Sequence, residues 1–534
     1  MKPIQAEIII KNGRIASINP AENKVTIKNE KSKFTFMNSW LYPGFVDTHG
    51  HVFGLGQFLE GLNLNNAGSE EECIEQCLKY NKYRENWLVG RGWNQELWNH
   101  KSYPSKKTLD SVFKNIPVYL TRVDGHAAWV NSKALKLAGI NKNTPDPPGG
   151  KILRENNGEL TGLLIDNAMY LVSDEIPDFP DESVDEMILS ACDELLRNGI
   201  TEIHDMDVSP DILTYFIDLD IAGKIPIRIQ SFLETKNKKN WIYKKKEKSG
   251  LFNQNSSVTK RNPSMYYGNK LNVTGLKFYM DGALGSRGAA LLDDYSDKPG
   301  EKVLLLLDQE KFYNRIKKGI ENGYGIAIHA IGDKANRICL RTYEQIFKDK
   351  IAGVDDLLRI EHAQIVHPDD LEYFSKYDIC AALQPVHCLS DAPMARKRLG
   401  DRISLRYPWK SLLKYTNRIG GGSDFPIESH NPLTGISALC SRIPFNENEP
   451  WIPEEIIGIE DALDLYTKNA HILSQNNDRR GEIEIGNDAD FTILNQNLTK
   501  INTKKILESK VEAVFVNGKN VAENLITKKH LSTT

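Results

Sequence analysis

Short apolar runs that end in polar residues recur along most of this chain, and they limit it to few folds. Eight runs have the length and the Val, Ile and Leu content of buried strands. They span residues 44–52, 200–206, 227–233, 273–280, 324–330, 357–363, 378–385 and 418–425. From the second run onward the spacings leave room for a helix between neighbours, as parallel strands require. We therefore predict an α/β fold built on a (β/α)8 TIM-like barrel.

Six polar side chains stand at or near the carboxyl ends of five of these runs. They are His49, His51, Lys277, His329, His362 and Asp424. In a parallel barrel the carboxyl strand ends meet on one face, which is the face that carries the chemistry. His49 and His51 are two apart on one strand and so point to the same side. Four imidazoles, a lysine and a carboxylate are enough to hold two divalent cations, and the pattern predicts a metal-dependent hydrolase.

The segments around these residues resemble a known group of enzymes. The segments are KFYMDGALGSRGAAL (277–291), IAIHAIGD (326–333), EHAQ (361–364) and GGSDFPIESHNPL (421–433). They resemble the amidohydrolase superfamily, and within it the amidohydrolase 3 family, which includes N-substituted formamide deformylase. The likeness runs from about Ile8 to Val521.

The chemistry of the donors suggests which metal would bind. Imidazole together with carboxylate-type oxygen suits zinc, although manganese, iron, cobalt or nickel could also fit. A buried Lys277 has a lowered pKa, and its neutral amine can add carbon dioxide. The resemblance implies that such a carboxylated lysine bridges two metal ions. The alternative is an ordinary lysine paired with Asp281 beside a single metal.

Asp424 is the predicted catalytic residue as well as a ligand. It would accept a proton from a water that the cations activate and pass that proton to the leaving nitrogen. The expected reaction is hydrolysis of a C–N bond of amide type in a small molecule by the resulting metal-activated hydroxide. An N-cap role for Asp424 in the next short helix is the alternative.

Further residues are expected to contact the substrate. They are His126, Arg287, Gln384, His387 and Trp93. His126 could instead be tied to Asp124, and Arg287 could brace Asp281. Core packing is an equal alternative for Trp93.

The chain is long enough for more than one folding unit. Short strand-like segments at both ends predict one composite β-sandwich of residues 1–44 and 477–534, an arrangement that the resemblance also implies. The barrel is expected over 45–65 and 179–476. The long gap after the first barrel strand predicts an inserted α+β subdomain, 66–178, over the active face. The lysine-rich stretch 235–257 is expected to be a solvated loop rather than a nucleic-acid site.

Composition excludes several classes of partner. The formal net charge is −3 and no apolar run approaches the length of a membrane span. We therefore expect a small-molecule substrate, no nucleic acid and no membrane, a cytoplasmic location, and a homodimer on base rates. Two alternatives stay open. One is a deaminase or lactonase on the same scaffold, and the other is a non-catalytic regulatory protein that keeps the hydrolase fold.

Overall fold

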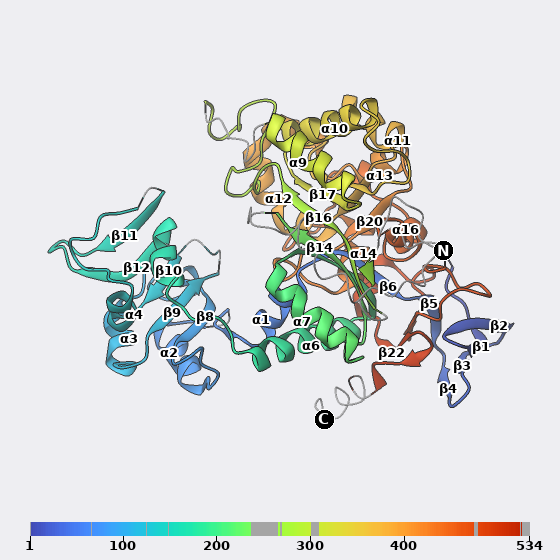
Figure 1. Cartoon of the computed structure of the whole chain (residues 1–534), viewed down its shortest axis with the longest axis horizontal. Helices are drawn as coiled ribbons and strands as arrows, with labels where there is room; N and C mark the ends of the chain where they lie inside the picture. Colours follow the sequence, from blue (N-terminus) through green and yellow to red (C-terminus); the bar gives the residue numbers. More distant parts are fainter. Residues whose placement is uncertain are drawn as a thin grey trace. The chain divides into compact units, whose positions relative to one another are not determined.

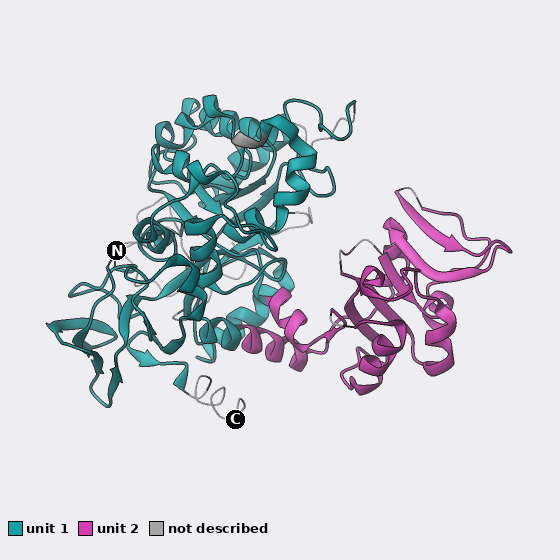
Figure 2. Ribbon diagram, turned by 180° about the vertical axis from the view of Figure 1, so that it is seen from behind, with its two compact units in different colours: residues 1–52, 192–534 teal, residues 53–191 magenta. Residues whose placement is uncertain are grey.

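The chain divides into two compact units in a computed structural model. Unit 1 comprises residues 1–52 and 192–534, and unit 2 comprises residues 53–191 (Figure 2). The structure describes residues 2–65, 67–123, 125, 127–147, 149–235, 265–266, 270–300, 309–474, 479–523 and 525. His126, its suggested partner Asp124 and nearly all of the lysine-rich stretch lie outside the described residues. No helix in the described part of the chain is long and apolar enough to cross a membrane.

A sheet of eight parallel strands forms the centre of unit 1, and this confirms the predicted barrel. Its strands are β6 (Phe45–Gly50), β13 (Ile200–Val208), β14 (Arg228–Glu234), β16 (Leu271–Tyr279), β17 (Gly325–Ala330), β18 (Leu358–His362), β19 (Cys380–Leu383) and β20 (Ile419–Gly421). They pair in chain order from β6 to β20, and the short β15 (Met265–Tyr266) adds to β16 in the antiparallel sense. Nearly every residue of these strands is buried, as expected when both faces of a parallel sheet are covered.

Backbone contacts between the first and last strands bring the sheet close to closure. The Asp424 amide donates to the His49 carbonyl at 2.7 Å, and the His51 amide donates to the Phe425 carbonyl at 3.1 Å. These bonds hold the segment after β20 against the end of β6.

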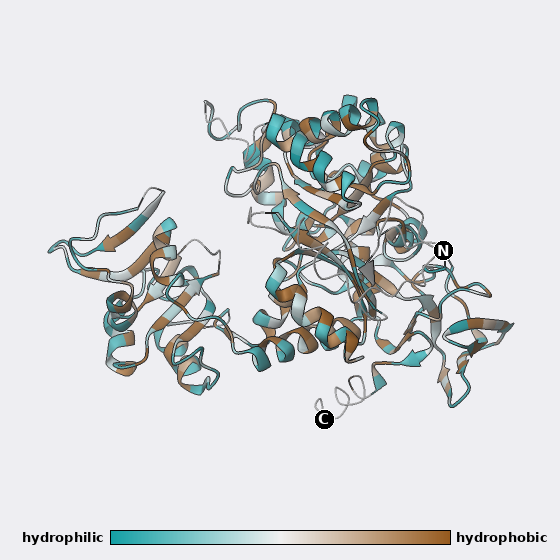
Figure 3. Ribbon diagram, in the orientation of Figure 1, coloured by the Kyte–Doolittle hydropathy of each residue, from teal (hydrophilic) through white to brown (hydrophobic). Residues whose placement is uncertain are grey.

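Helices fill the crossovers of the barrel. In chain order they are α7 (Pro210–Ile221), α9 (Gln309–Glu321), α10 (Asp333–Lys348), α11 (Glu372–Lys376), α12 (Pro385–Leu399) and α13 (Trp409–Leu413). Three more helices follow the last barrel strand: α14 (Pro432–Ser441), α15 (Ile459–Leu465) and α16 (Lys468–Ile472). Helix α7 begins after Ser209, whose Oγ accepts from the Ile212 amide, and Pro210 takes the first helical position. Helices α9 and α10 lie beside β17 (Figure 1). Both carry hydrophilic and hydrophobic residues along their length (Figure 3), and α9 buries Phe312, Ile316 and Ile320 on one face.

Strands from both ends of unit 1 form two small sheets. One sheet has the order β2-β1-β3-β4, and the other has the order β23-β22-β21-β5. Their strands are β1 (Ala6–Lys11), β2 (Arg14–Pro20), β3 (Lys24–Lys28), β4 (Lys33–Met37), β5 (Trp40–Pro43), β21 (Phe491–Leu494), β22 (Val511–Val516) and β23 (Lys519–Asn520). Both sheets contribute to one buried apolar cluster, in which Ile8 and Val25 of the first join Phe491 and Phe515 of the second.

Unit 2 is built on a six-stranded sheet with the order β11-β12-β10-β9-β8-β7. Its elements are α1 (Val52–Glu60), β7 (Leu62–Asn63), α2 (Glu70–Lys79), β8 (Leu88–Trp93), α3 (Lys106–Val112), β9 (Val118–Arg122), β10 (Ala127–Val130), α4 (Ser132–Leu137), β11 (Gly150–Arg154), β12 (Leu160–Asp166), α5 (Tyr170–Ser173) and α6 (Asp181–Arg197). The first residue of α1 and the part of α6 from Cys192 onward belong to unit 1. The sequence predicts strands within 86–93 and 117–126, where β8 and β9 stand. The expected bounds of the inserted subdomain, 66–178, and its place over the active face stay predictions.

Candidate metal centre

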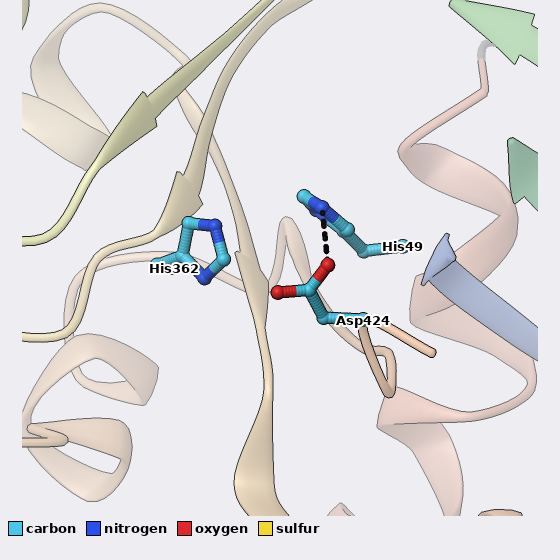
Figure 4. A group of neighbouring side chains, drawn as sticks. All are labelled: His49, His362 and Asp424. Atoms are coloured by element: carbon cyan, nitrogen blue, oxygen red, sulfur yellow. Dashed lines mark ion pairs between the residues drawn. The ribbon is translucent and has the colours of Figure 1, made fainter. Parts of the chain in front are cut away.

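All six predicted ligands belong to unit 1, at the carboxyl ends of barrel strands. His49 and His51 stand at the end of β6, His329 is in β17, and His362 is the last residue of β18. Lys277 is near the end of β16, and Asp424 follows β20. Figure 4 shows that His49, His362 and Asp424, which come from three different strand ends, face one another.

His49 is at the middle of the group. Its Nε2 lies 3.4 Å from Lys277 Nζ and 3.5 Å from Asp424 Oδ1. The same carboxylate oxygen lies 3.1 Å from His51 Nε2. One potential ligand atom from each of His49, His362 and Asp424 falls within 4.8 Å of the other two. This spacing suits a common cation.

His362 links His49 to His329. The ring centres of His362 and His49 are 5.0 Å apart, and those of His362 and His329 are 4.4 Å apart. His362 Nδ1 and His329 Nε2 are buried and have no hydrogen-bond partner in the described structure, although Asp281 Oδ1 lies 3.7 Å from His329 Nε2. Buried imidazole nitrogens are normally satisfied, so these two fit the role of metal ligands.

Hydrogen bonds to the Nδ1 atoms of His49 and His51 determine that Nε2 of each ring faces the other ligands. His51 Nδ1 lies 3.0 Å from the Met206 carbonyl oxygen, which can only accept, so this nitrogen carries the proton. His49 Nδ1 lies 2.6 Å from Glu361 Oε2. In both residues Nε2 is therefore the atom turned toward Asp424, and carboxylate or carbonyl partners of this kind orient metal-binding histidines.

Glu361 is itself held by a fully buried arginine. Arg359 Nε donates to Glu361 Oε1 at 2.8 Å and Arg359 Nη2 donates to Oε2 at 3.0 Å. The same guanidinium donates to the carbonyl oxygens of Thr48 and Leu473 and lies 2.9 Å from His204 Nδ1. Arg359 thus fixes both the carboxylate behind His49 and the backbone next to His49.

Burial keeps His49, His329 and His362 neutral. The pKa of His51, although burial opposes it, is raised by its contact with the Asp424 carboxylate. Burial, reinforced by the Lys277 cation, lowers the pKa of His49 to about 4 and the pKa of His329 to about 3. Burial also holds the pKa of His362 well below its usual range. Although burial opposes it, the contact with His51 and the nearby imidazoles hold the pKa of Asp424 well below the usual range. Neutral imidazoles and an ionised carboxylate are the forms that bind metal.

Lys277 is almost fully buried, and burial lowers the pKa of its ammonium. Its suggested alternative partner, Asp281, is occupied elsewhere. Asp281 accepts backbone N–H bonds from Ala290, Ile331 and Gly332, which fix the segment that follows β17. The structure therefore gives Asp281 a backbone-fixing role and places Lys277 against His49.

The backbone is strained where two of the ligands stand. His362 has φ +73° and Asp424 has φ +60°, a region that residues other than glycine rarely adopt. Gly422 allows the close approach of this segment to β6, because a Cβ there would lie 2.6 Å from the backbone nitrogen of His49. Backbone strain of this kind is common at functional positions.

The predicted substrate residues are dispersed. His387, in the first turn of α12, lies next to the ligands, with its ring stacked 6.0 Å from that of His362 and its Nε2 3.8 Å from Asp424 Oδ2. Gln384 precedes α12, is buried, and donates to the Ala382 carbonyl. Arg287 pairs with Asp297 at 2.9 Å. Trp93 is fully buried in the core of unit 2, where its Nε1 donates to the Leu120 carbonyl.

Sequence reasoning assigned no role to several polar residues of the site. Arg359 and Glu361 are two apart on β18, so they share one side of the strand, and the charged pair within an apolar run was the available signal. Tyr279 follows Lys277 at the same spacing, donates to Asp207 Oδ2 at 2.9 Å, and lies 5.4 Å from His329 between ring centres. Tyr279 therefore forms part of the wall beside the ligands.

Comparisons with known proteins agree with this geometry. The model of the amidohydrolase family matches residues 38–522. The Bacillus subtilis (strain 168) protein YtcJ, whose name gives it as an inferred amidohydrolase, is 32% identical over 509 residues, which cover 92% of this chain and 91% of YtcJ. N-substituted formamide deformylase of Arthrobacter pascens is 24% identical over 527 residues, 96% of this chain and 94% of the relative.

A solved structure shares the same architecture. The crystal structure of an uncharacterized metal-dependent hydrolase from Pyrococcus horikoshii superposes with a TM-score of 0.75 at 25% identity, over 94% of this chain and 99% of that chain. Barrel, strand-end histidines and relatives together define a metal-dependent hydrolase. The chain belongs to the amidohydrolase family, as the sequence segments indicate.

Proposed function

We propose that this amidohydrolase cleaves a C–N bond of amide type in a small molecule and uses two divalent cations, with zinc favoured by the donor set. The observation that carries the proposal is the meeting of His49, His362 and Asp424 within 4.8 Å, beside buried imidazole nitrogens that lack a partner among the described residues. The name of the Arthrobacter relative supports the choice of a C–N bond.

The residues that would hold the cations are the six predicted ligands. They are His49, His51, Lys277, His329, His362 and Asp424. Divalent cations bound here would polarise a substrate carbonyl and lower the pKa of a bound water toward neutrality. We further propose that Lys277 is carboxylated. In support of this, its amine is buried and its pKa is lowered, which favours the neutral form that adds carbon dioxide.

Asp424 is the proposed acid–base residue. It is ionised, is held by the backbone bond from its own amide to His49, and has imidazoles rather than other carboxylates as its neighbours. In this role it accepts a proton from the attacking water and delivers it to the leaving nitrogen. His387, 3.8 Å from the other oxygen of the Asp424 carboxylate, is placed to orient the substrate beside it.

The direct test combines metal analysis with a substrate panel. Purified full-length protein is stripped with chelator, reloaded with zinc or manganese, and assayed on N-substituted formamides, N-acyl amino acids, cyclic amides and lactones. We expect close to two equivalents of metal per chain, loss of turnover on stripping, recovery on reloading, and the highest kcat/KM on one of the amide substrates.

Two results would overturn the proposal. Turnover of lactones alone would replace the amide assignment with the lactonase alternative. A protein that binds no stoichiometric metal and turns over none of the panel would favour the regulatory alternative. An Asp369→Asn variant serves as the charge-removal control for Asp424→Asn, because the Asp369 side chain is 81% exposed whereas that of Asp424 is 13% exposed.

A further inference from the structure

A second group of polar side chains in unit 1 lacks partners, and it is separate from the proposed ligands. Arg406 is fully buried. Its Nε, Nη1 and Nη2 atoms are all buried and have no hydrogen-bond partner among the described residues. A buried charge is normally paired, because the transfer of an unpaired ion from water to the protein interior is strongly unfavourable. Arg406 therefore needs a partner that the described part of the chain does not provide.

Two neighbours of Arg406 also present unused donors. Trp451 Nε1 and Arg442 Nη2 are buried and have no hydrogen-bond partner in the described part of the chain. The Arg406 guanidinium carbon lies 5.6 Å from the centre of the Trp451 ring. Arg442 is bonded to the backbone beside these residues. Its Nε donates to the Trp451 carbonyl at 2.9 Å, and its Nη1 donates to the carbonyl of Tyr407, the residue after Arg406, at 3.0 Å.

The unused atoms are all donors. Three belong to Arg406, one to Arg442 and one to Trp451, which makes five buried nitrogens. The carboxylate that acts on Arg406 is Asp391, and its Oδ2 accepts from Tyr407 Oη at 2.8 Å and from Gln364 Nε2 at 3.1 Å. Burial lowers the pKa of Arg406 to about 10, so the guanidinium is still charged at neutral pH.

We propose that Arg406, Trp451 Nε1 and Arg442 Nη2 bind one small monovalent anion, with chloride as the ligand that the test uses. An anion accepts from several N–H groups at once and balances the charge of Arg406, which a water molecule cannot do. A monovalent ion fits because Asp391 already supplies part of the negative charge. Two aromatic rings lie beside the group, since the Tyr407 and Trp451 ring centres are 5.8 Å apart, and this favours a compact ion.

The proposed anion would brace the segment that follows the His362 strand. Arg406 pairs with Ile365 in an isolated antiparallel bridge, and the Tyr407 amide donates to the Gln364 carbonyl at 2.7 Å. Gln364 stands two residues after His362. The anion therefore stabilises the folded protein and, through this bridge, the end of β18.

Thermal unfolding of the full-length, metal-loaded protein tests the proposal. Chloride or bromide is compared with gluconate at equal ionic strength and with the same cation. We expect a midpoint about 1–2 °C higher in the halide salts, because a ligand that binds only the folded state stabilises it. Arg406→Leu should lose this halide-specific rise. Arg396→Leu is the matched control and should keep it, since Arg396 also lies near Trp451 but is paired with Glu447 at 2.6 Å.

Equal midpoints in halide and gluconate for the unmodified protein would overturn the proposal, as would a halide effect that persists in Arg406→Leu. If Arg406→Leu does not fold, bromide-soaked crystals of the unmodified protein decide the question. An anomalous peak within hydrogen-bond reach of Arg406 and Trp451 Nε1 supports the site. Density for water alone at that position rules it out.

Discussion

Buried ion pairs at the amino-terminal end of the barrel contrast with imidazole nitrogens that lack partners at its carboxyl end. At the amino-terminal end, Arg228 Nε donates to Asp490 Oδ2 at 2.7 Å, and Glu202 forms an ion pair with Arg480. At the carboxyl end, imidazole nitrogens of His329 and His362 lack hydrogen bonds within the described structure. In barrels of this kind one end serves stability and the other serves chemistry.

This contrast shows where the chain keeps binding capacity. Polar groups that are satisfied within the protein stabilise the fold but have nothing left to offer a ligand. Groups that are left unsatisfied, on a backbone with positive φ at His362 and Asp424, cost stability and remain available for metal and substrate. Substitutions at the two ends should therefore separate activity from stability.

Asp424→Asn should produce the largest effect, at the carboxyl end. The amide cannot accept the proton from water, so kcat should fall about 10²–10⁴-fold. The free energy of unfolding should not rise, because the lowered pKa of Asp424 means that its ionised form is stabilised in the folded state. Steady-state kinetics and urea unfolding measure the two quantities. A kcat within a few-fold of the original would remove Asp424 from the mechanism.

Arg228→Leu should have the reverse effect at the amino-terminal end. It leaves the buried Asp490 carboxylate unpaired, which should lower the free energy of unfolding by about 3–5 kcal/mol. Metal content and kcat per folded molecule should stay close to the original values. Urea unfolding and metal analysis of the same preparation check this. Loss of activity without loss of stability would contradict the division between the two ends.

Glu361→Gln probes the support of His49 and should weaken metal affinity about 10–100-fold. Gln can still accept from His49 Nδ1, but it no longer carries the charge that Arg359 pairs with. Competition with a chelator in the absence of substrate measures the metal affinity directly. Glu344→Gln is a control, because Glu344 is also a carboxylate in ion pairs, which it forms with Arg341 and Lys348 on α10. An unchanged affinity would make Glu361 a packing residue only.

The pH dependence of stability should show the smallest effect of the four predictions. Although burial opposes it, the Arg228 guanidinium lowers the pKa of Asp490. A carboxylate whose pKa is lower in the folded state contributes stability above its unfolded pKa of about 3.9, and this contribution is lost as pH falls through the folded value. Metal-free Asp490→Asn should therefore lose less stability than the metal-free original protein between about pH 5 and pH 3. If the urea midpoints of the two metal-free proteins fell in parallel over this pH range, Asp490 would not account for the pH dependence.

Much of the barrel could be predicted because its signals are local. The runs 44–52 and 324–330 contain β6 and β17, since parallel strands buried on both faces are continuous apolar stretches. The polar residues at their ends pointed to one face of the barrel, where the structure brings His49, His362 and Asp424 together. Their roles as ligands stay predictions.

The roles of the buried charged residues around the site could not be predicted from local sequence patterns. Arg359 and Glu361 are as buried as the apolar residues around them, and their value depends on partners such as His49 and Thr48, more than 300 positions away. Arg406 stands in an ordinary polar segment, and nothing in that segment indicates burial. Contacts between distant parts of the chain determine these environments, and a pattern of neighbouring residues does not encode them.

The connectivity of the site has a consequence for its assembly. His51 and Asp424 meet although 373 positions separate them, and β6 pairs with a strand that begins at Ile200. A growing polypeptide therefore exposes one pair of histidines long before their companions exist, and contacts over such separations form slowly. A cation that binds before the later ligands are synthesised contacts only His49 and His51. Full occupancy becomes a marker of finished maturation, which a time course of metal uptake during refolding could follow.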